Sequence, residues 1–284
     1  MSARLNSYTR AGFRFDVLDT GPVDGPVVVA LHGFPQTATS FTEFSALLAD
    51  RGYRTVAPTQ RGYSPGARPR GRAAYRMPEL VADVVELIRE IDRGPVHLVG
   101  HDWGAMVAWS LAAARPDLVR TLVTMSVPHP GAFLRSMLSS DQLFRSFYMG
   151  LFQVPVVPER LLTARPDVLD RALTATGMSP EVLARVHSEI VDTGALPTAL
   201  NWYRALVVPG NRTLSTVPVR VPVTHVWSTG DTALTRRGAE LTERFVVGDY
   251  RLAVVDDASH WLPDERPLAL ADLVTQRIES VPVS

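Results

Sequence analysis

Short runs of β-branched and apolar residues alternate with longer amphipathic segments through most of the chain. The short runs predict strands at 13–18, 27–31, 54–57, 96–99, 122–125, 223–227 and 250–255. Several of them are apolar at nearly every position, as strands buried on both faces of a sheet are. The longer segments predict helices at 41–51, 77–91, 104–115, 235–245 and 267–279. This alternation indicates an α/β fold, in which helices cover both faces of a mostly parallel sheet.

The alternation breaks in the third quarter of the chain. There, prolines separate helical segments and no strand is predicted. Ser179 and Pro180 have the residue types of a helix N-cap and a first helical position. We therefore expect an α/β core formed by residues 1–128 and 218–284, interrupted by a helical cap over residues 129–217.

The charges of the chain are balanced, since there are 29 acidic and 29 basic residues. No nucleic-acid partner is implied by this balance. An arginine cluster at 61–72 is rich in glycine and proline, which predicts a surface loop. The first residues lack the apolar stretch of a signal peptide, and no apolar run is long enough to cross a bilayer. We therefore expect a cytoplasmic protein without a membrane partner.

Two amino acids are missing from the composition, and each absence excludes classes of chemistry. The chain contains no cysteine, which excludes a thiol nucleophile, a disulfide and a cysteine-ligated metal. All 29 basic residues are arginine, which excludes a lysine Schiff base and the lysine of a nucleotide-binding P-loop. The sequence implies no metal, nucleotide or other cofactor.

The segment from Gly100 to Gly104 joins a predicted strand directly to a predicted helix, and its central residue is Asp102. Small residues two positions before and after the centre allow a sharp turn that pushes the central side chain out at the end of the strand. Such an elbow usually presents a serine nucleophile. Here it predicts an aspartate nucleophile, the alternative being an aspartate that caps the following helix.

An aspartate nucleophile restricts the reactions that are plausible. A carboxylate is already ionised at neutral pH, so it needs no base to activate it. Its attack on a carbonyl carbon gives a reactive anhydride, whereas its attack on an sp³ carbon gives an alkyl ester that water can cleave. Epoxides and alkyl halides are the substrates that this chemistry suggests, with water as the second reactant.

Cleavage of such an ester needs a base, for which His260 is the candidate. It follows the last predicted strand, and Asp231 follows the strand before it, which gives the chain order nucleophile, acid, histidine. Asp256 and Asp257 compete with Asp231 for the acid role, but their closeness to His260 in sequence makes the far ring nitrogen hard to reach. Other histidines lie where packing explains them: His32, His97, His101, His187 and His225.

The ester oxyanion needs hydrogen-bond donors, which backbone N–H groups commonly provide. One is expected from Trp103, the residue after the nucleophile. The other is expected from Phe34, because Gly33 lets the backbone turn toward the site. The alternative for this early loop is an ordinary turn that ends a strand.

Taken together, these residues make the chain resemble the epoxide hydrolases of the α/β-hydrolase superfamily over nearly its whole length. The resemblance implies an eight-stranded, mostly parallel sheet with an inserted helical cap, and a cis peptide before Pro35. The matching segments are His32-Gly33-Phe34-Pro35, Arg61-Gly62-Tyr63-Ser64, Gly100-His101-Asp102-Trp103-Gly104, Asn201-Trp202-Tyr203-Arg204, Gly230-Asp231 and His260-Trp261.

The resemblance also implies two cap tyrosines that hydrogen-bond the epoxide oxygen. Tyr203 matches one of them directly, and Tyr148 is our choice for the other. A phenol suits this task because it stays protonated at neutral pH and can donate to the developing alkoxide. Alternatively, both are amphipathic helix residues with hydrated hydroxyls. Further cap residues either line an apolar pocket or belong to the core: Phe133, Met137, Phe144, Phe152 and Trp202.

We therefore expect an epoxide hydrolase that forms a vicinal diol from an apolar epoxide through an ester on Asp102. Haloalkane dehalogenases, which share this nucleophile, typically have Asn where this chain has Phe34. Haloacid dehalogenases bind the substrate carboxylate with arginines where this chain has Trp103 and Met106. A non-catalytic ligand receptor on the same fold has no need for Asp102, Asp231 and His260 together. The sequence leaves the epoxide and the choice between monomer and homodimer open.

Overall fold

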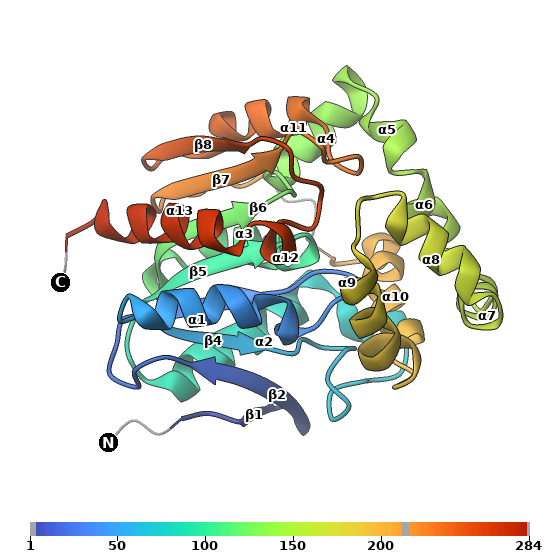
Figure 1. Ribbon diagram of the computed structural model, residues 1–284, viewed down its shortest axis with the longest axis horizontal. Coiled ribbons are helices and arrows are strands. Elements are labelled where there is room, and N and C mark those ends of the chain that lie inside the picture. Colours follow the sequence, from blue (N-terminus) through green and yellow to red (C-terminus); the bar gives the residue numbers. More distant parts are fainter. Residues whose placement is uncertain (1–3, 212–215, 283–284) are drawn as a thin grey trace.

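The computed structural model describes residues 4–211 and 216–282, and its centre is an eight-stranded sheet with the order β1-β2-β4-β3-β5-β6-β7-β8 (Figure 1). At one edge of the sheet, β2 pairs antiparallel with both β1 and β4. The neighbours from β4 to β8 in the strand order pair parallel. The mostly parallel eight-stranded sheet is therefore confirmed. The strands are β1 (Ser7–Arg10), β2 (Phe13–Thr20), β3 (Val27–Leu31), β4 (Arg54–Pro58), β5 (Val96–His101), β6 (Val119–Met125), β7 (Val223–Ser228) and β8 (Tyr250–Val255).

Helices cover both faces of the sheet (Figure 1). Phe44 of α1 and Val274 of α13 belong to the cluster on one face, and Leu87 of α2 and Val107 of α3 belong to the larger cluster that extends under the cap. These core helices are α1 (Thr42–Asp50), α2 (Met77–Ile91), α3 (Trp103–Ala114), α11 (Arg236–Leu241), α12 (Leu262–Glu265) and α13 (Pro267–Glu279). Shorter turns of 3₁₀ helix are η1 (Ala38–Phe41), η2 (Arg72–Tyr75), η3 (Pro116–Leu118) and η6 (Thr242–Phe245).

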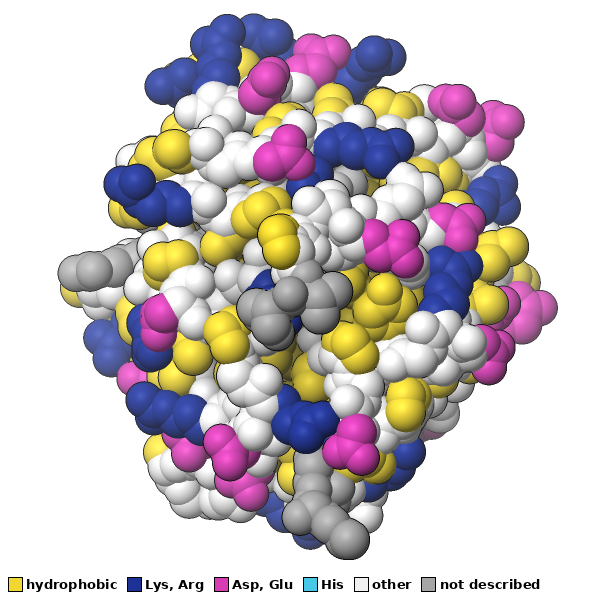
Figure 2. Space-filling view, turned by 90° about the vertical axis from the view of Figure 1, so that its left-hand side faces the viewer, with side chains coloured by type: hydrophobic (Ala, Val, Ile, Leu, Met, Phe, Trp, Pro, Cys, Tyr) yellow, Lys and Arg dark blue, Asp and Glu magenta, His cyan; other side chains and the backbone are white. Residues whose placement is uncertain are grey.

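The predicted elements are present, and they differ from the structure in details. β1 was not predicted, because its four residues, Ser-Tyr-Thr-Arg, carry no apolar alternation. The helix predicted at 41–51 begins as the 3₁₀ turn η1, and the helix predicted at 235–245 ends as the 3₁₀ turn η6. On the face in Figure 2, basic and acidic side chains are interspersed, in keeping with the balanced charge. Within residues 4–211 and 216–282, no helix combines the length and hydrophobicity that a bilayer span requires.

The chain between β6 and β7 is helical, and its described residues contain no named strand. α4 packs on the core beside α11, because its Ala132 forms one cluster with Leu241 and Phe245. The later helices lie beyond the carboxyl edge of the parallel strands (Figure 1). The helices of the whole segment between β6 and β7 are α4 (Pro130–Ser139), α5 (Gln142–Arg145), α6 (Phe147–Leu151), α7 (Val157–Ala164), α8 (Pro166–Thr174), α9 (Pro180–Val186), the π-helical η4 (His187–Val191), α10 (Leu196–Arg204) and η5 (Ala205–Val207).

The helix start predicted at Ser179 and Pro180 is confirmed, because the Ser179 hydroxyl accepts a hydrogen bond from the backbone N–H of Val182 at 3.3 Å. The limits of the cap at residues 129 and 217 stay a prediction. Residues 212–215, which fall inside this predicted segment, lie outside the described residues, as do 1–3 and 283–284 of the predicted core.

The prediction of a surface loop at 61–72 is wrong for its first residues. Arg61 is only 3% exposed, and its guanidinium forms an ion pair with Asp83 at 2.7 Å. The carbonyl of Arg61 accepts a hydrogen bond from the Trp202 indole N–H at 2.8 Å, and that of Gly62 accepts one from the Thr198 hydroxyl at 2.5 Å. The buried start of this loop therefore attaches α10 to the core.

Candidate active site

The turn at Asp102 has the geometry that the Gly100 to Gly104 segment predicts. β5 ends at residue 101, α3 begins at residue 103, and Asp102 between them has a φ of 50°. A Cβ atom on Gly104 would lie 2.0 Å from the carbonyl oxygen of Leu31, and one on Gly100 would lie 2.6 Å from the carbonyl oxygen of Gly104. Both positions therefore require glycine. The Asp102 side chain makes no helix-capping hydrogen bond, which argues against the alternative of a plain N-cap.

Both predicted backbone donors meet at the Asp102 carboxylate. The Phe34 N–H donates to Oδ1 at 2.8 Å, and the Trp103 N–H lowers the pKa of the same carboxyl group. A Cβ atom on Gly33 would lie 2.4 Å from both Cβ and Oδ1 of Asp102, so only glycine allows this approach. The peptide between Phe34 and Pro35 is cis, as the resemblance implies.

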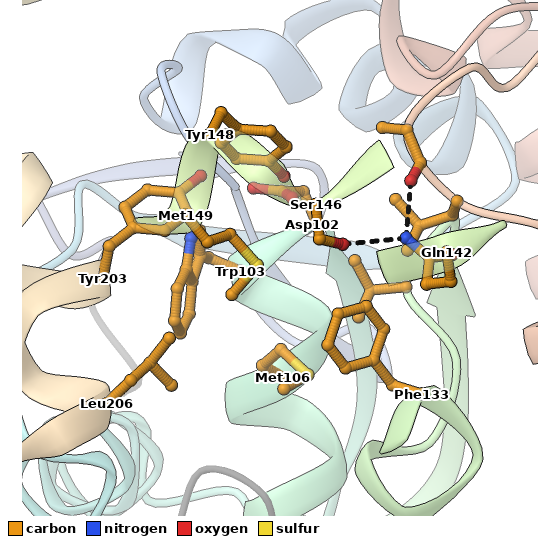
Figure 3. A pocket seen from close by; sticks show the side chains of 13 residues that line it. Asp102, Trp103, Met106, Phe133, Gln142, Ser146, Tyr148, Met149, Tyr203 and Leu206 are labelled. Carbon is orange, nitrogen blue, oxygen red and sulfur yellow. Dashed lines mark hydrogen bonds between the residues drawn. The ribbon is translucent and has the colours of Figure 1, made fainter. Parts of the chain in front are cut away.

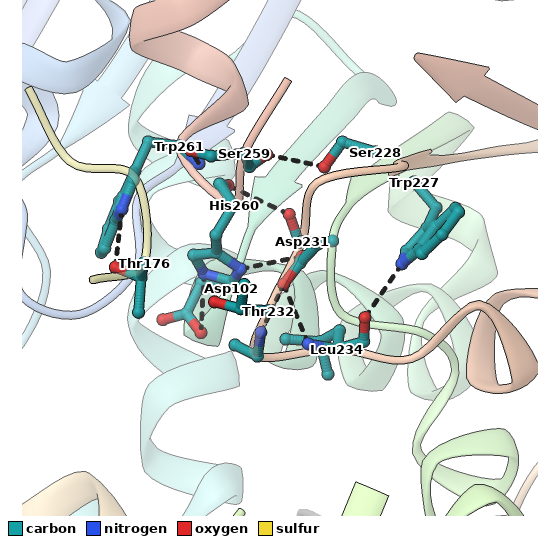
Figure 4. Close-up of polar contacts among 12 residues, drawn as sticks. Asp102, Thr176, Trp227, Ser228, Asp231, Thr232, Leu234, Ser259, His260 and Trp261 are labelled. Carbon is teal, nitrogen blue, oxygen red and sulfur yellow. Dashed lines mark hydrogen bonds and ion pairs between the residues drawn. The ribbon is translucent and has the colours of Figure 1, made fainter. Parts of the chain in front are cut away.

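His260 lies between two carboxylates (Figure 4). Its Nε2 is 3.8 Å from Oδ2 of Asp102, and its Nδ1 is 3.0 Å from Oδ2 of Asp231. The backbone N–H groups of Ala233 and Leu234 donate to Oδ1 of Asp231 at 2.8 and 2.9 Å, which fixes the orientation of this carboxylate. The structure therefore places Asp231 in hydrogen-bonding contact with His260.

The two competing acids are placed elsewhere. Asp256 and Asp257 lie on the exposed turn after β8, and no hydrogen bond joins either carboxylate to His260 among the described residues. The backbone of Asp257 is engaged instead, since its carbonyl accepts a hydrogen bond from Arg266 at 2.7 Å. Of the acids considered from the sequence, Asp231 alone pairs with the histidine in this part of the chain.

The backbone around His260 is held by side chains that the sequence did not identify for this purpose. The carbonyl of His260 accepts hydrogen bonds from Nε2 of His101 at 2.9 Å and from the Ser126 hydroxyl at 3.2 Å. Burial lowers the pKa of His101 to about 3, so its ring is neutral and carries its proton on Nε2. The neighbouring Ser259 carbonyl accepts a hydrogen bond from the Ser228 hydroxyl at 2.6 Å (Figure 4).

The three ionisable groups influence one another. Burial raises the pKa of Asp102, although the charge of His260 and two backbone N–H groups oppose this effect. Burial lowers the pKa of His260, but the charge and hydrogen bond of Asp231 and the charge of Asp102 outweigh burial and raise it. Burial also raises the pKa of Asp231, yet the charge and hydrogen bond of His260 and the N–H groups of Leu234 and Ala233 hold it below its ordinary value.

Two tyrosines from separate cap helices lie over Asp102 (Figure 3). Tyr148 comes from α6 and Tyr203 from α10, and their ring centroids are 6.0 Å apart. The rings of Trp103 and Tyr203 are in edge-to-face contact with their centroids 5.0 Å apart, and the indole N–H, which can only donate, opposes the rise in the pKa of Tyr203 that burial causes. Burial raises the pKa of both phenols, as does the charge of Asp102, so both stay protonated at neutral pH.

A cavity opens between the core and the cap at this point. Of the five aromatic and methionine cap residues that the sequence suggested for its wall, only Phe133 lines it. Phe144 is 78% exposed, and Phe152 packs against the rings of Phe34 and Tyr203. The lining residues are Asp102, Trp103, Met106, Val127, Phe133, Gln142, Ser146, Tyr148, Met149, Tyr203, Leu206, Ala233 and Leu234 (Figure 3).

Several of these lining residues carried no signal in the sequence. Gln142 and Leu206 stand in short helices and Ser146 lies in the turn between α5 and α6, where helical spacing does not distinguish a cavity-facing position from a core position. A signal was available only for residues that belong to a recognisable local turn or to a segment that matches the family.

Comparisons with known proteins agree with this architecture. A family model described as the alpha/beta hydrolase fold matches residues 26–267. Epoxide hydrolase 3 of Xenopus tropicalis is 35% identical over 90% of this chain and 72% of that protein. Epoxide hydrolase A of Mycobacterium tuberculosis is 32% identical over 90% of this chain and 91% of that protein. An AB hydrolase superfamily protein of Bacillus subtilis is 34% identical over 95% of this chain and 96% of that protein.

Solved structures show the same similarity in three dimensions. The crystal structure of epoxide hydrolase A from Mycobacterium thermoresistibile superposes with a TM-score of 0.83 at 26% identity, over 98% of each chain. An epoxide hydrolase from Vigna radiata superposes with a TM-score of 0.81 at 26% identity, over 97% of each chain. The expected fold is therefore confirmed over nearly the whole length of the chain.

Proposed function

The chain belongs to the epoxide hydrolases of the α/β-hydrolase superfamily, and from this premise we propose that it opens an apolar epoxide to a vicinal diol through an ester on Asp102. One observation carries the proposal. The Asp102 carboxylate lies in one cavity with two protonated phenols on the cap side, and it meets two backbone N–H groups and a histidine on the core side. This arrangement supplies a group for each bond that must form or break.

In the first step Asp102 is the nucleophile. Its Oδ2 attacks an epoxide carbon while Oδ1 keeps its hydrogen bond from the Phe34 N–H. The ring C–O bond breaks, and its electron pair passes to the epoxide oxygen. Tyr148 and Tyr203 donate hydrogen bonds to that oxygen, and one of them transfers its proton. The product of this step is an alkyl ester of Asp102 that carries a neighbouring hydroxyl.

In the second step His260 is the base. Its Nδ1 is held by Asp231, so Nε2 is free to take a proton from water as the water oxygen attacks Cγ of Asp102. The N–H groups of Phe34 and Trp103 stabilise the oxyanion on Oδ1. The bond between Cγ and Oδ2 then breaks, so the diol keeps Oδ2 as its second oxygen, and the two protons of water end on this second hydroxyl and on the tyrosinate.

The lining of the cavity favours an uncharged epoxide over halide chemistry. No arginine stands among the lining residues, so the described wall offers no partner to the carboxylate of a haloacid. The Trp103 indole packs against the Tyr203 ring, and Phe34 has no side-chain donor for a departing halide. Both features support a neutral leaving oxygen that is protonated by tyrosine.

A single turnover in ¹⁸O-labelled water tests the covalent step. We expect the label in the Asp102 carboxylate, because water attacks Cγ and the diol receives the original aspartate oxygen. Label found only in the diol, with none in the Asp102 peptide, would mean that water attacks the epoxide directly. A substrate panel completes the test: terminal and aryl epoxides should give diols, and haloalkanes and haloacetates should release no halide above the Asp102→Asn control.

A further inference from the structure

Two polar side chains that line the cavity have no role in the proposed mechanism. Gln142 and Ser146 both line it, and they are 1% and 7% exposed. The other lining side chains are the residues already assigned to the reaction or its oxyanion and apolar residues. Two buried polar groups in an otherwise apolar wall are typical of groups that orient a ligand.

The hydrogen bonds of Gln142 determine the orientation of its amide. Its Oε1 accepts the backbone N–H of Thr235 at 2.9 Å, and because an N–H can only donate, this end of the amide is the oxygen. Its Nε2 donates to the carbonyl of Ala233 at 2.8 Å and to the Ser146 hydroxyl at 3.0 Å. Both amide protons are therefore used, and the oxygen of Ser146 is an acceptor.

The consequence for Ser146 is a free proton. Its hydroxyl accepts from Gln142, so its single proton must point elsewhere. Within residues 4–211 and 216–282, no acceptor for this proton lies in hydrogen-bonding range. A buried donor without a partner costs free energy, so an acceptor inside the cavity is expected to satisfy it. Figure 3 shows the Ser146 and Gln142 side chains in the wall of the same cavity as Asp102.

We propose that Gln142 and Ser146 form a donor subsite for a neutral oxygen acceptor, such as an ether or ester oxygen, on the substituent of the epoxide. The inference rests on the proposed function and specifies its substrate class. A neutral acceptor is favoured because Asp102 is an anion in the same cavity. The nearby cation of Arg145 is engaged, since it donates to the carbonyl of Asp231 at 3.1 Å and pairs with Asp141 at 2.8 Å.

Matched substrates isolate this one hydrogen bond. Each pair consists of an aliphatic epoxide and its analogue in which one methylene of the chain is an ether oxygen, with the oxygen stepped along the chain. For at least one oxygen position, Ser146→Ala should lower the ratio of kcat/KM for ether over alkyl substrate by about fivefold. The control is Ser139→Ala, since that exposed hydroxyl donates to the carbonyl of Arg135 on α4 and should leave every ratio unchanged.

The outcomes separate the two proposals. If wild type and Ser146→Ala form diols with the same ratio at every oxygen position, the subsite is wrong while the epoxide hydrolase function stands. If the wild type forms no diol from any pair, the proposed function itself fails and the subsite falls with it. Equal melting temperatures of the two serine variants and the wild type would show that the ratio reports recognition and not a loss of fold.

Discussion

The cavity has a core wall, formed around Asp102 with Asp231 behind it, and a cap wall, which carries Tyr148 and Tyr203. The two walls hold their functional groups in different ways. On the core wall, the Asp102 carboxylate accepts a backbone N–H at 2.8 Å, and Asp231 accepts two. On the cap wall, Tyr203 is held by rings, with those of Trp103 and Phe34 at 5.0 and 5.4 Å from its own. Directed backbone hydrogen bonds hold the two carboxylates of the core wall, whereas ring packing holds Tyr203 on the cap wall.

This difference teaches where the reaction tolerates change. A hydrogen bond weakens steeply with distance and angle, so a group oriented by several of them has one working position. Aromatic packing favours edge-to-face contacts over a range of separations, so a ring can shift slightly and still pack. We therefore expect substitutions on the core wall to abolish a chemical step, and substitutions on the cap wall to slow a step or change substrate preference.

The largest effect is expected for Asp102→Asn. The amide has nearly the same shape but is not an ionised nucleophile, so diol formation should fall by about 10⁴-fold or more. Steady-state diol release and thermal unfolding are the measurements. Asp92→Asn is the matched control, because Asp92 is an exposed residue with a φ of 49°, which Asn also tolerates. Residual activity within tenfold of wild type would remove Asp102 from the nucleophile role.

His260→Gln should lower turnover by about 10³-fold by blocking only the second step. Because Asp102 and both tyrosines remain, the enzyme should still be alkylated, and its mass should increase by the mass of one substrate. Intact-protein mass spectrometry after mixing with excess epoxide measures this ester. His187→Gln, at a histidine that pairs with Asp170 in the cap, should behave like wild type. A stalled enzyme without added mass would contradict the assignment.

Asp231→Asn should lower the rate by about 10²- to 10³-fold and also move the pH profile. His260 can take a proton from water only when it is neutral, so activity falls as the pH drops through its pKa. Asp231 raises that pKa, so its replacement should shift the acid limb of kcat to lower pH. Asp256→Asn and Asp257→Asn should leave the limb in place. A shift in either control would reopen the choice of acid.

The core wall could be predicted from the sequence because each of its parts belongs to a short local pattern. Asp102 is marked by two glycines that the turn requires, and His260 and Asp231 by their places after consecutive strands. The cap wall could not be predicted in this way. Tyr203 was found by family resemblance alone, and Gln142 and Ser146 were missed, because the helix face that meets the cavity depends on how the cap lies on the core.

The buried start of the 61–72 loop illustrates the same limit. Arginine, glycine and proline together favour a solvent-exposed loop, and that is the local preference. Arg61 is buried because its partner Asp83, 22 residues away on α2, neutralises it, and because Trp202 of α10 covers its carbonyl. Contacts between distant segments override the local preference, and no pattern within the loop reports them.

On the cap wall, Tyr203→Phe and Tyr148→Phe should each slow ring opening by about 10- to 100-fold, since the other phenol still assists the leaving oxygen. Single-turnover alkylation is the measurement. The raised pKa of both phenols also predicts that ring opening does not decline with rising pH below the ordinary tyrosine value of 10.0. Tyr250→Phe is the control, because that hydroxyl donates to the carbonyl of Ala239. Unchanged alkylation in both variants would mean that neither phenol acts on the epoxide.

The smallest effect is expected for Trp103→Phe, at a residue that contributes to both walls. Its backbone N–H lowers the pKa of Asp102 on the core wall, and its indole N–H lowers the pKa of Tyr203 on the cap wall. Phenylalanine keeps the first and removes the second. A phenol whose oxygen is stabilised by a nearby N–H group is a better proton donor. Loss of the indole N–H should therefore slow ring opening by about twofold to tenfold.

Because the backbone N–H remains in Trp103→Phe, hydrolysis of the ester should keep its wild-type rate. Pre-steady-state kinetics separate the two steps by following formation and decay of the alkylated enzyme. A selective decrease in the first step would show that the indole acts through Tyr203. An equal decrease in both steps would instead place the indole in the packing of the cavity, and would show that the core wall depends on ring packing as much as the cap wall does.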